Sequence, residues 1–203
     1  MERVQFYIDG FNLYFGIKES GWDDALWLNL KTLCESLLKE EQVSINIKYF
    51  TSRVRNNPPK EKRQNTYLDA LSSLSNLHII YGHYQSRIEN CRKCGHSYPY
   101  GSEKMTDVNI AVELMTDAFT NQYDTAILIS GDSDLVPPVK AIKSIFPAKK
   151  IVVAFPPNRF NNIMKLAADG HVFINRTRII NCQLPDSIFT AQGHMLERPA
   201  TWK

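Results

Sequence analysis

Short apolar runs alternate with segments of helical spacing along most of this chain, and this alternation constrains the fold more than any other feature. The runs predict strands at 4–8, 45–53, 77–84, 125–130, 150–155 and 171–175. The segments between them predict helices over 28–38, through Tyr67 to Leu74, over 104–119, to about Ile145, and over about 159–167. Strands that are apolar on both faces belong in a parallel sheet covered by helices on both sides. We therefore expect an α/β fold with a mostly parallel sheet.

The chain is long enough for one domain with additions. We place that domain at 1–175, with a Cys-containing insertion at about 86–103, where polar residues, Gly and Pro replace the periodic pattern. A tail follows at 176–203, with no sustained period. It either covers a sheet edge, joins a homodimer or frays.

Composition excludes several classes of protein. Of the 203 residues, 43% are apolar and 22% charged, which excludes collagen-like, low-complexity and mostly disordered chains. No apolar run approaches the roughly 20 residues of a membrane span, and residues 1–8 lack the apolar core of a secretory signal. These features predict a soluble, cytoplasmic protein without a membrane partner. The net charge of +3 does not indicate nucleic acid, so a basic surface would have to be local.

Four carboxylates fall where a parallel sheet would bring them to one edge. Asp9 follows the first predicted strand, and Asp132 and Asp134 follow the fourth. Asp107 lies in the first turn of the 104–119 helix, whose start returns to the same edge. Open α/β sheets bind ligands at the carboxyl ends of their strands, preferably where the strand order reverses.

Carboxylates that lie within a few ångströms of one another repel unless a cation compensates them. Mg²⁺ and Mn²⁺ prefer such oxygen ligands and can activate water and stabilise the leaving oxygen of a phosphodiester. Asn12 and Ser130 lie beside the acidic positions and could orient a ligand or bind a phosphate oxygen. Alternatively, Asp-Gly and Gly-Asp are ordinary turn residues, and Asp107 is an ordinary helix-start residue.

Four segments together resemble the NYN domain, and more narrowly its bacterial LabA-like branch, a relative of PIN-type nucleases. They are FYIDGFNLYFG (6–16), EKMTDVNIAVELMTDAF (103–119), TAILISGDSDLVPPVKAIK (125–143) and KLAADGHVFI (165–174). The I-D-G-x-N start and the S-G-D-S-D turn are the most specific pieces, and the resemblance covers about residues 3–175.

The resemblance implies a PIN-like three-layer α/β/α sandwich and a metal-dependent ribonuclease that hydrolyses RNA with Mg²⁺ or Mn²⁺. It assigns the metal-binding carboxylates to Asp9, Asp107, Asp132 and Asp134, and the accompanying polar positions to Asn12 and Ser130. Asp169 matches a further acidic position near the last strand, although Asp-Gly there is also a plain turn.

The insertion contains half of a zinc-site pattern, Cys91-Arg92-Lys93-Cys94-Gly95. With His83 and His96, the two cysteines would make a Cys₂His₂ set for structural Zn²⁺. The alternative is a reduced loop pair that binds no metal. Loss of stoichiometric zinc on replacing Cys91 by serine would support the site.

Basic residues gather after the second predicted strand and suit an RNA backbone that enters an acidic centre. The predicted RNA-binding residues are Arg53, Arg55, Lys60, Lys62, Arg63 and Lys104. Lys48 belongs to the same group by sequence. The alternative is a solvated, charged loop.

Two other functions stay open. One is a non-catalytic RNA-binding or regulatory module on the same fold, which would bind RNA without forming products. The other is a haloacid-dehalogenase-type phosphatase, which needs a second Asp two residues after its Asp nucleophile; Phe11 stands at that position after Asp9.

Overall fold

The computed structural model of the chain describes residues 1–190 and 193–203, and the side chains of residues 84–87 and 98–103 are outside that description. The central strands are β1 (Glu2–Asp9), β2 (Gln42–Thr51), β3 (Leu77–Tyr81), β6 (Thr125–Ile129), β7 (Lys150–Phe155) and β8 (Gly170–Phe173). The α-helices are α1 (Gly10–Glu19), α2 (Leu30–Glu35), α3 (Pro58–Ser72), α4 (Thr106–Phe119), α5 (Val136–Ile145), α6 (Asn162–Ala167) and α7 (Arg176–Asn181). The remaining elements are β4 (His83–Asn90), β5 (Ser97–Lys104), β9 (Ser187–Phe189), β10 (Met195–Glu197) and the 3₁₀ turns η1 (Asp23–Ala25), η2 (Ser133–Leu135) and η3 (Ala200–Trp202).

The six central strands form one parallel sheet in the order β3-β2-β1-β6-β7-β8, which confirms the predicted α/β class. The chain moves outward from β1 through β2 to β3, then returns to β6 on the other side of β1 and moves outward again. The strand order therefore reverses between β1 and β6. This is the place where open α/β sheets bind ligands, at the carboxyl ends of the strands.

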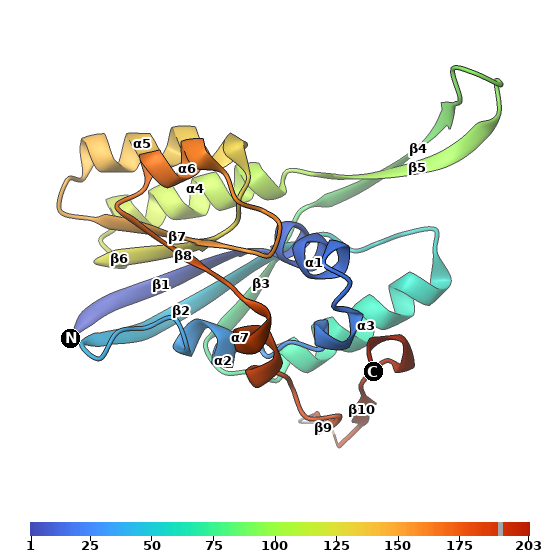
Figure 1. Cartoon of the computed structure of the whole chain (residues 1–203), viewed down its shortest axis with the longest axis horizontal. Helices are drawn as coiled ribbons and strands as arrows, with labels where there is room; N and C mark the ends of the chain where they lie inside the picture. Colours follow the sequence, from blue (N-terminus) through green and yellow to red (C-terminus); the bar gives the residue numbers. More distant parts are fainter. Residues whose placement is uncertain (191–192) are drawn as a thin grey trace.

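Helices cover both faces of the sheet and make two hydrophobic cores (Figure 1). Helices α1, α2, α3 and α7 pack on one face, and α4, α5 and α6 pack on the other. Successive side chains of β1 point to opposite faces of the sheet, so this strand contributes to both cores. Phe6 and Ile8 pack in the core under α1, α2, α3 and α7, whereas Tyr7 packs in the core under α4, α5 and α6. The result is the expected three-layer sandwich.

Local chemistry explains where the two helices that border the ligand edge begin. The Asp9 side chain caps α1 by accepting a hydrogen bond from the Asn12 amide. Asn57 caps α3 in the same way, and Pro58 and Pro59 occupy the first helical positions, where the missing amide hydrogens cost nothing. The sequence analysis did not predict α1.

Residues 83–104 differ from the expected irregular insertion. They form an antiparallel hairpin, β4–β5, that pairs His83 with Lys104 at its base and Asn90 with Ser97 at its tip. The predicted strand 77–84 is therefore two strands, which separate at Gly82. A side chain at Gly82 would come within 2.5 Å of the Thr106 hydroxyl, so glycine lets the hairpin leave the body beside the start of α4.

The C-terminal residues pack against the α1–α3 face. Trp202 is 6% exposed and its ring lies beside those of Trp27 and Tyr67. The Trp27 indole N–H donates to the Pro185 carbonyl at 2.8 Å. This part of the chain therefore belongs to the core of the structure, although its sequence shows no sustained period.

Candidate metal-dependent site at the carboxyl edge of the sheet

Asp9 is the centre of the candidate site, because it ends β1 beside the reversal of strand order. One carboxylate oxygen accepts the Asn12 amide at 3.0 Å, and the other accepts the Ser130 hydroxyl at 2.9 Å. Ser130 follows β6, so this second bond joins the two strands that flank the reversal. Asp9 is 4% exposed, which makes it a buried carboxylate with two neutral donors and no cationic partner among its described hydrogen bonds.

The turn after β6 is held by a chain of hydrogen bonds that starts at the same place. The Asp132 amide donates to Ser130 Oγ at 3.0 Å, and the Asp134 amide donates to Asp132 Oδ1 at 2.9 Å. The Gly131 amide donates to Asn12 Oδ1 at 3.0 Å, which ties this turn to α1. Asn12 and Ser130 thus orient the acidic residues, as the sequence analysis proposed for them.

Glycine at 131 allows a close approach on the opposite side of the turn. A Cβ atom there would lie 1.7 Å from the Arg159 carbonyl oxygen, so no side chain fits without moving backbone. Arg159 follows β7 and pairs with Glu19 at 2.7 Å, while its Nε has no hydrogen-bond partner among the described residues. The sequence analysis missed this cation; its place just after the fifth predicted strand is the signal that could have found it.

Asp107 joins the site from the first turn of α4. The residue before the helix, Met105, has a φ of 73°, the left-handed conformation that non-glycine residues rarely adopt. This sharp turn brings the chain from the hairpin into α4 and sets Asp107 at the sheet edge. Asp134, by contrast, is exposed at the outer end of its turn.

Electrostatics show that the carboxylates lie near one another. Burial, with a smaller contribution from the charges of Asp107 and Asp132, raises the pKa of Asp9 to about 6 against the two hydrogen bonds, which lower it. Burial also raises the pKa of Asp107, with Asp132 and Asp134 adding to the effect. The fold therefore gathers carboxylates that resist full ionisation.

The donor set fits a hard divalent cation by its chemistry, since carboxylate, amide and hydroxyl oxygens are the ligands that Mg²⁺ and Mn²⁺ prefer. The side chains do not form a closed ligand set, however. Within the described part of the chain, no three His, Cys, Asp or Glu side chains converge closely enough to hold a metal ion. An ion would have to draw these carboxylates closer.

Asp169 does not belong to this group. It precedes β8, at the amino edge of the sheet, where it accepts the Ile151 amide at 2.8 Å and pairs with Lys143 at 2.8 Å. The expected acidic position near the last strand is therefore at the opposite edge from Asp9. Its observed contacts are those of a residue that joins β7, β8 and α5.

The predicted basic residues divide into several places. Arg53 contacts Asn65 and lies over the Tyr81 ring, 4.9 Å from its centroid, while Arg55, Lys60 and Lys104 are exposed. Lys48 is not on the rim, contrary to the sequence analysis. It lies within β2 and pairs with Asp117 at 2.5 Å and Glu113 at 2.6 Å.

This Lys48 network lies against the sheet face that α4 covers. Asp117 accepts the Tyr7 hydroxyl at 2.6 Å and a hydrogen bond from Gln5 as well. Asp117 lies on the buried side of α4, in line with Ile110 and Leu114. A charged residue on this otherwise apolar side of the helix could have predicted a buried ion pair. The network fixes α4, and with it Asp107, against the central strands.

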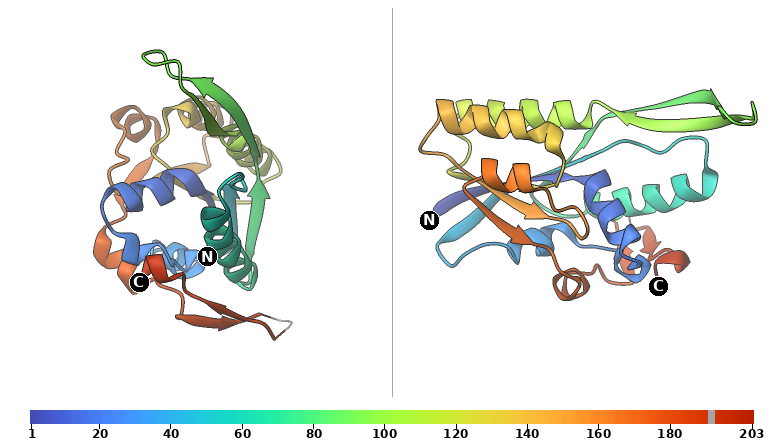
Figure 2. Two further views of the ribbon diagram at one scale, coloured as in Figure 1. Left: turned by 90° about the vertical axis from the view of Figure 1, so that its right-hand side faces the viewer. Right: turned by 45° about the horizontal axis from the view of Figure 1, so that its top comes forward.

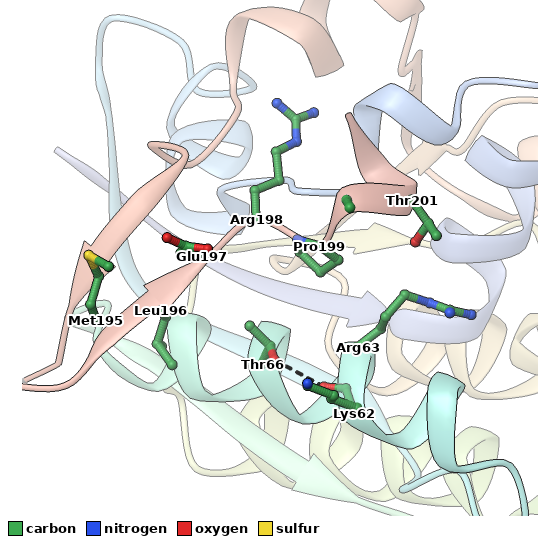
Figure 3. A pocket seen from close by; sticks show the side chains of 10 residues that line it. Lys62, Arg63, Thr66, Met195, Leu196, Glu197, Arg198, Pro199 and Thr201 are labelled. Carbon is green, nitrogen blue, oxygen red and sulfur yellow. Dashed lines mark hydrogen bonds between the residues drawn. The ribbon is translucent and has the colours of Figure 1, made fainter.

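Lys62 and Arg63 line a pocket of about 490 Å³ between α3 and residues 195–201 (Figure 3). The Thr66 hydroxyl in its wall donates to the Lys62 carbonyl at 3.0 Å. None of the four acidic residues of the edge lines this pocket. It is a pocket with basic residues in its wall and is distinct from the acidic site.

The predicted Cys₂His₂ set is not brought together. His83 is at the base of the β4–β5 hairpin, whereas Cys91, Cys94 and His96 surround its tip. A strand rises about 3.4 Å per residue, so the seven steps between the eight residues from His83 to Asn90 span about 24 Å. His83 cannot share a metal ion with the cysteines of the same chain.

Comparison with known proteins identifies the family of this chain. The family model of the NYN domain matches residues 3–175, which is most of the chain. The chain belongs to the NYN domain family. This family lies in the PIN-like nuclease superfamily, whose members typically use divalent metals, and NYN nucleases act on RNA.

Two individual proteins are similar over most of their length. The chain is 26% identical to the 6-hydroxy-3-succinoylpyridine 3-monooxygenase HspA of Pseudomonas putida (strain DSM 28022 / S16), covering 90% of this chain and 70% of that protein. It also resembles the crystal structure of a protein of unknown function, VPA0982 from Vibrio parahaemolyticus RIMD 2210633, with a TM-score of 0.56 and 21% identity. That match covers 86% of this chain and 94% of the other.

The helices give no sign of a membrane span. Over the residues that the structure describes, none of them is both long enough and apolar enough to cross a bilayer.

Proposed function

We propose that this protein is a metal-dependent ribonuclease that hydrolyses RNA phosphodiester bonds at the carboxyl edge of its sheet. The observation that carries the proposal is the buried Asp9 carboxylate, tied to Ser130 across the reversal of strand order and raised in pKa by burial and by Asp107 and Asp132. Buried, mutually repelling carboxylates in a ligand-binding position are more typical of a functional site than of a structural one.

Asp9, Asp107 and Asp132 would hold Mg²⁺ or Mn²⁺, with Asp134 contributing from the outer end of its turn. The ion, when bound, supplies activation of water and stabilisation of the leaving oxygen. Ser130 and Asn12 keep the carboxylates oriented through the hydrogen bonds described above. An ion would also compensate the repulsion that adds to the effect of burial in raising the pKa of Asp9 and Asp107.

Cations at the same edge support an RNA substrate. Arg53, Arg55 and Lys60 follow the carboxyl end of β2, and Lys104 ends β5 two residues before α4. Lys62 and Arg63 would extend this path into the pocket beside α3. Arg159, whose backbone carbonyl approaches Gly131, would add a further cation near the turn after β6. These residues would hold the phosphate backbone while the carboxylates act on one bond.

The test uses one fluorescently labelled single-stranded RNA and metal-free protein. Adding Mn²⁺ or Mg²⁺ should produce fragments with 3′-hydroxyl and 5′-phosphate ends, and EDTA should stop the reaction. Asp132→Asn and Asp107→Asn should each lower the rate at least 100-fold, because each removes a ligand charge. Asp69→Asn, on the exposed side of α3, is the matched control and should keep the full rate.

Several results would overturn the proposal. Fragments that end in a 2′,3′-cyclic phosphate, or cleavage that survives EDTA, would show that the protein does not cut RNA by metal-dependent hydrolysis. Tight RNA binding without metal-dependent products would favour the non-catalytic module. Trapping of an aspartyl-phosphate would favour the phosphatase.

The similarity to a monooxygenase gives the experiment a further arm. A monooxygenase consumes O₂ and a reductant, so oxygen uptake is measured with 6-hydroxy-3-succinoylpyridine in the presence of a reductant. We expect none, because the described edge residues are oxygen donors for a hard cation. Substrate-dependent uptake would assign this protein an oxidative reaction, and its loss in Asp132→Asn would place that reaction at the acidic edge.

A further inference from the structure

The β4–β5 hairpin is an arm that extends from the body of the protein (Figures 1 and 2). Its two strands pair with each other and form a sheet separate from the central one. An isolated two-stranded hairpin is marginally stable in water, and small elements of this kind usually need a disulfide, a metal or a partner. We therefore expect a further interaction near the tip to stabilise the arm.

The turn at the tip presents two sulfur atoms on a closed loop of backbone. The Cys91 amide donates to the His96 carbonyl at 2.8 Å, and the Gly95 amide donates to the Cys91 carbonyl at 2.8 Å. Gly95 has a φ of 71°, which closes the turn, and Cys94 is exposed. Backbone amides of Lys93 and Cys94, and the Cys94 side chain, bond to Cys91. A thiolate held in this way is a metal ligand.

The ligand count shows that this site is half complete. Structural Zn²⁺ takes four ligands in a tetrahedron. The tip supplies two thiolates, and no group of three His, Cys, Asp or Glu side chains converges anywhere in the described part of the chain. His83 is about 24 Å away at the base of the arm. The described residues of the chain do not supply the missing ligands, and a second molecule can.

We propose that the arms of two copies of this chain meet at their tips and share one Zn²⁺ ion, bound by Cys91 and Cys94 of each copy. A two-fold axis places the two thiolates of one copy opposite the same two thiolates of the other. Two identical half-sites therefore make a complete Cys₄ site. The extended arm carries the tip away from the body, so two bodies need not collide when the tips meet (Figure 2).

Charge favours the same partner. Four thiolates and one Zn²⁺ sum to a charge of −2, and Arg92 and Lys93 on the two tips supply four positive charges around it. Ile88, 76% exposed near the end of β4, offers apolar surface that a second arm can cover. This inference does not depend on the ribonuclease proposal, because the tip shares no residue with the acidic edge.

The experiment adds zinc alone to reduced, metal-free, full-length protein and measures molar mass by light scattering and metal content after gel filtration. We expect a monomer without zinc, a dimer with zinc, and one zinc ion per two chains. EDTA should return the monomer. Cobalt in place of zinc should give the visible absorption of a tetrahedral site with four thiolates.

Variants separate this arrangement from its alternatives. Cys91→Ser with Cys94→Ser should remain monomeric with zinc and keep the unfolding temperature of the metal-free wild type, and it should not join a wild-type dimer on mixing. His96→Ala, the neighbouring control, should still form the dimer. One zinc per monomer, no zinc uptake, a dimer that survives loss of both cysteines, or a dimer that forms only without reductant would each overturn the proposal.

Discussion

Replacing Asp9 by asparagine should stabilise the metal-free protein while it removes a proposed metal ligand. Burial holds the pKa of Asp9 at about 6 rather than the ordinary 3.8, and at 1.36 kcal/mol per pKa unit this corresponds to about 3 kcal/mol at neutral pH. Asparagine keeps the cap of α1 through its carbonyl oxygen but loses the favourable interaction of a charge with the helix dipole, about 1 kcal/mol. The net gain is about 2 kcal/mol, or about 4–8 °C in Tm for a chain of this size.

The pH dependence of stability is a sharper test of the raised Asp9 pKa than the higher stability of Asp9→Asn at a single pH. Folded Asp9 keeps its proton up to about pH 6, whereas the unfolded chain releases it near 3.8. The folded state therefore binds more protons in this interval, and the wild-type free energy of unfolding falls as pH rises through it. The advantage of Asp9→Asn should accordingly shrink by about 1.4 kcal/mol from pH 8 to pH 5.

Urea unfolding at both pH values, with EDTA present, measures this difference, and Asp69→Asn serves as the exposed control. Adding Mg²⁺ or Mn²⁺ at 100 times its dissociation constant should then stabilise the wild type by about 2.7 kcal/mol and leave Asp9→Asn unchanged. A variant that is less stable than the wild type at pH 8, or whose advantage is equal at the two pH values, would refute the account of Asp9 as a strained buried carboxylate.

Three further substitutions test other parts of the structure. Gly131→Ala should cost about 1–3 kcal/mol in urea unfolding, because its Cβ would collide with the Arg159 carbonyl, and should slow metal-dependent cleavage; wild-type values for both would contradict the described turn. Lys48→Met should cost about 3–5 kcal/mol at neutral pH, because it leaves Asp117 buried without its cation; an unchanged midpoint would show that the pair is dispensable. Trp202→Ala should cost about 3–5 kcal/mol by the same assay, and a smaller loss would mean that the C-terminal segment packs loosely.

The sheet was predictable because each central strand is a short, strongly apolar run that ends at a turn. The edge that gathers Asp9, Asp107 and Asp132 followed from parallel topology alone, since parallel strands end together. Side-chain distances did not follow, because strand order and loop geometry decide them. This is why the sequence could place the acidic residues at one edge but could not show that they stop short of a closed ligand set.

The errors have physical reasons as well. Lys48 looked like a rim residue because it was grouped with the basic residues that follow the second predicted strand, but its partner Asp117 comes from a helix 69 residues further along the chain. The hairpin was hidden by Gly, Cys and Pro, which weaken a strand pattern without preventing two backbones from pairing. Residues 176–203 show no regular spacing of apolar residues because they pack on the body through single side chains such as Trp202.

The hydrogen bond between Asp9 and Ser130 also has a consequence for folding during synthesis on the ribosome. The two residues are 121 positions apart, so the Asp9 carboxylate has its second donor only after β6 has left the ribosome and docked beside β1. An N-terminal fragment released early contains the I-D-G-x-N segment but not the turn that completes the acidic edge. Under the proposed function, a truncated product could not cut the messenger that encodes it.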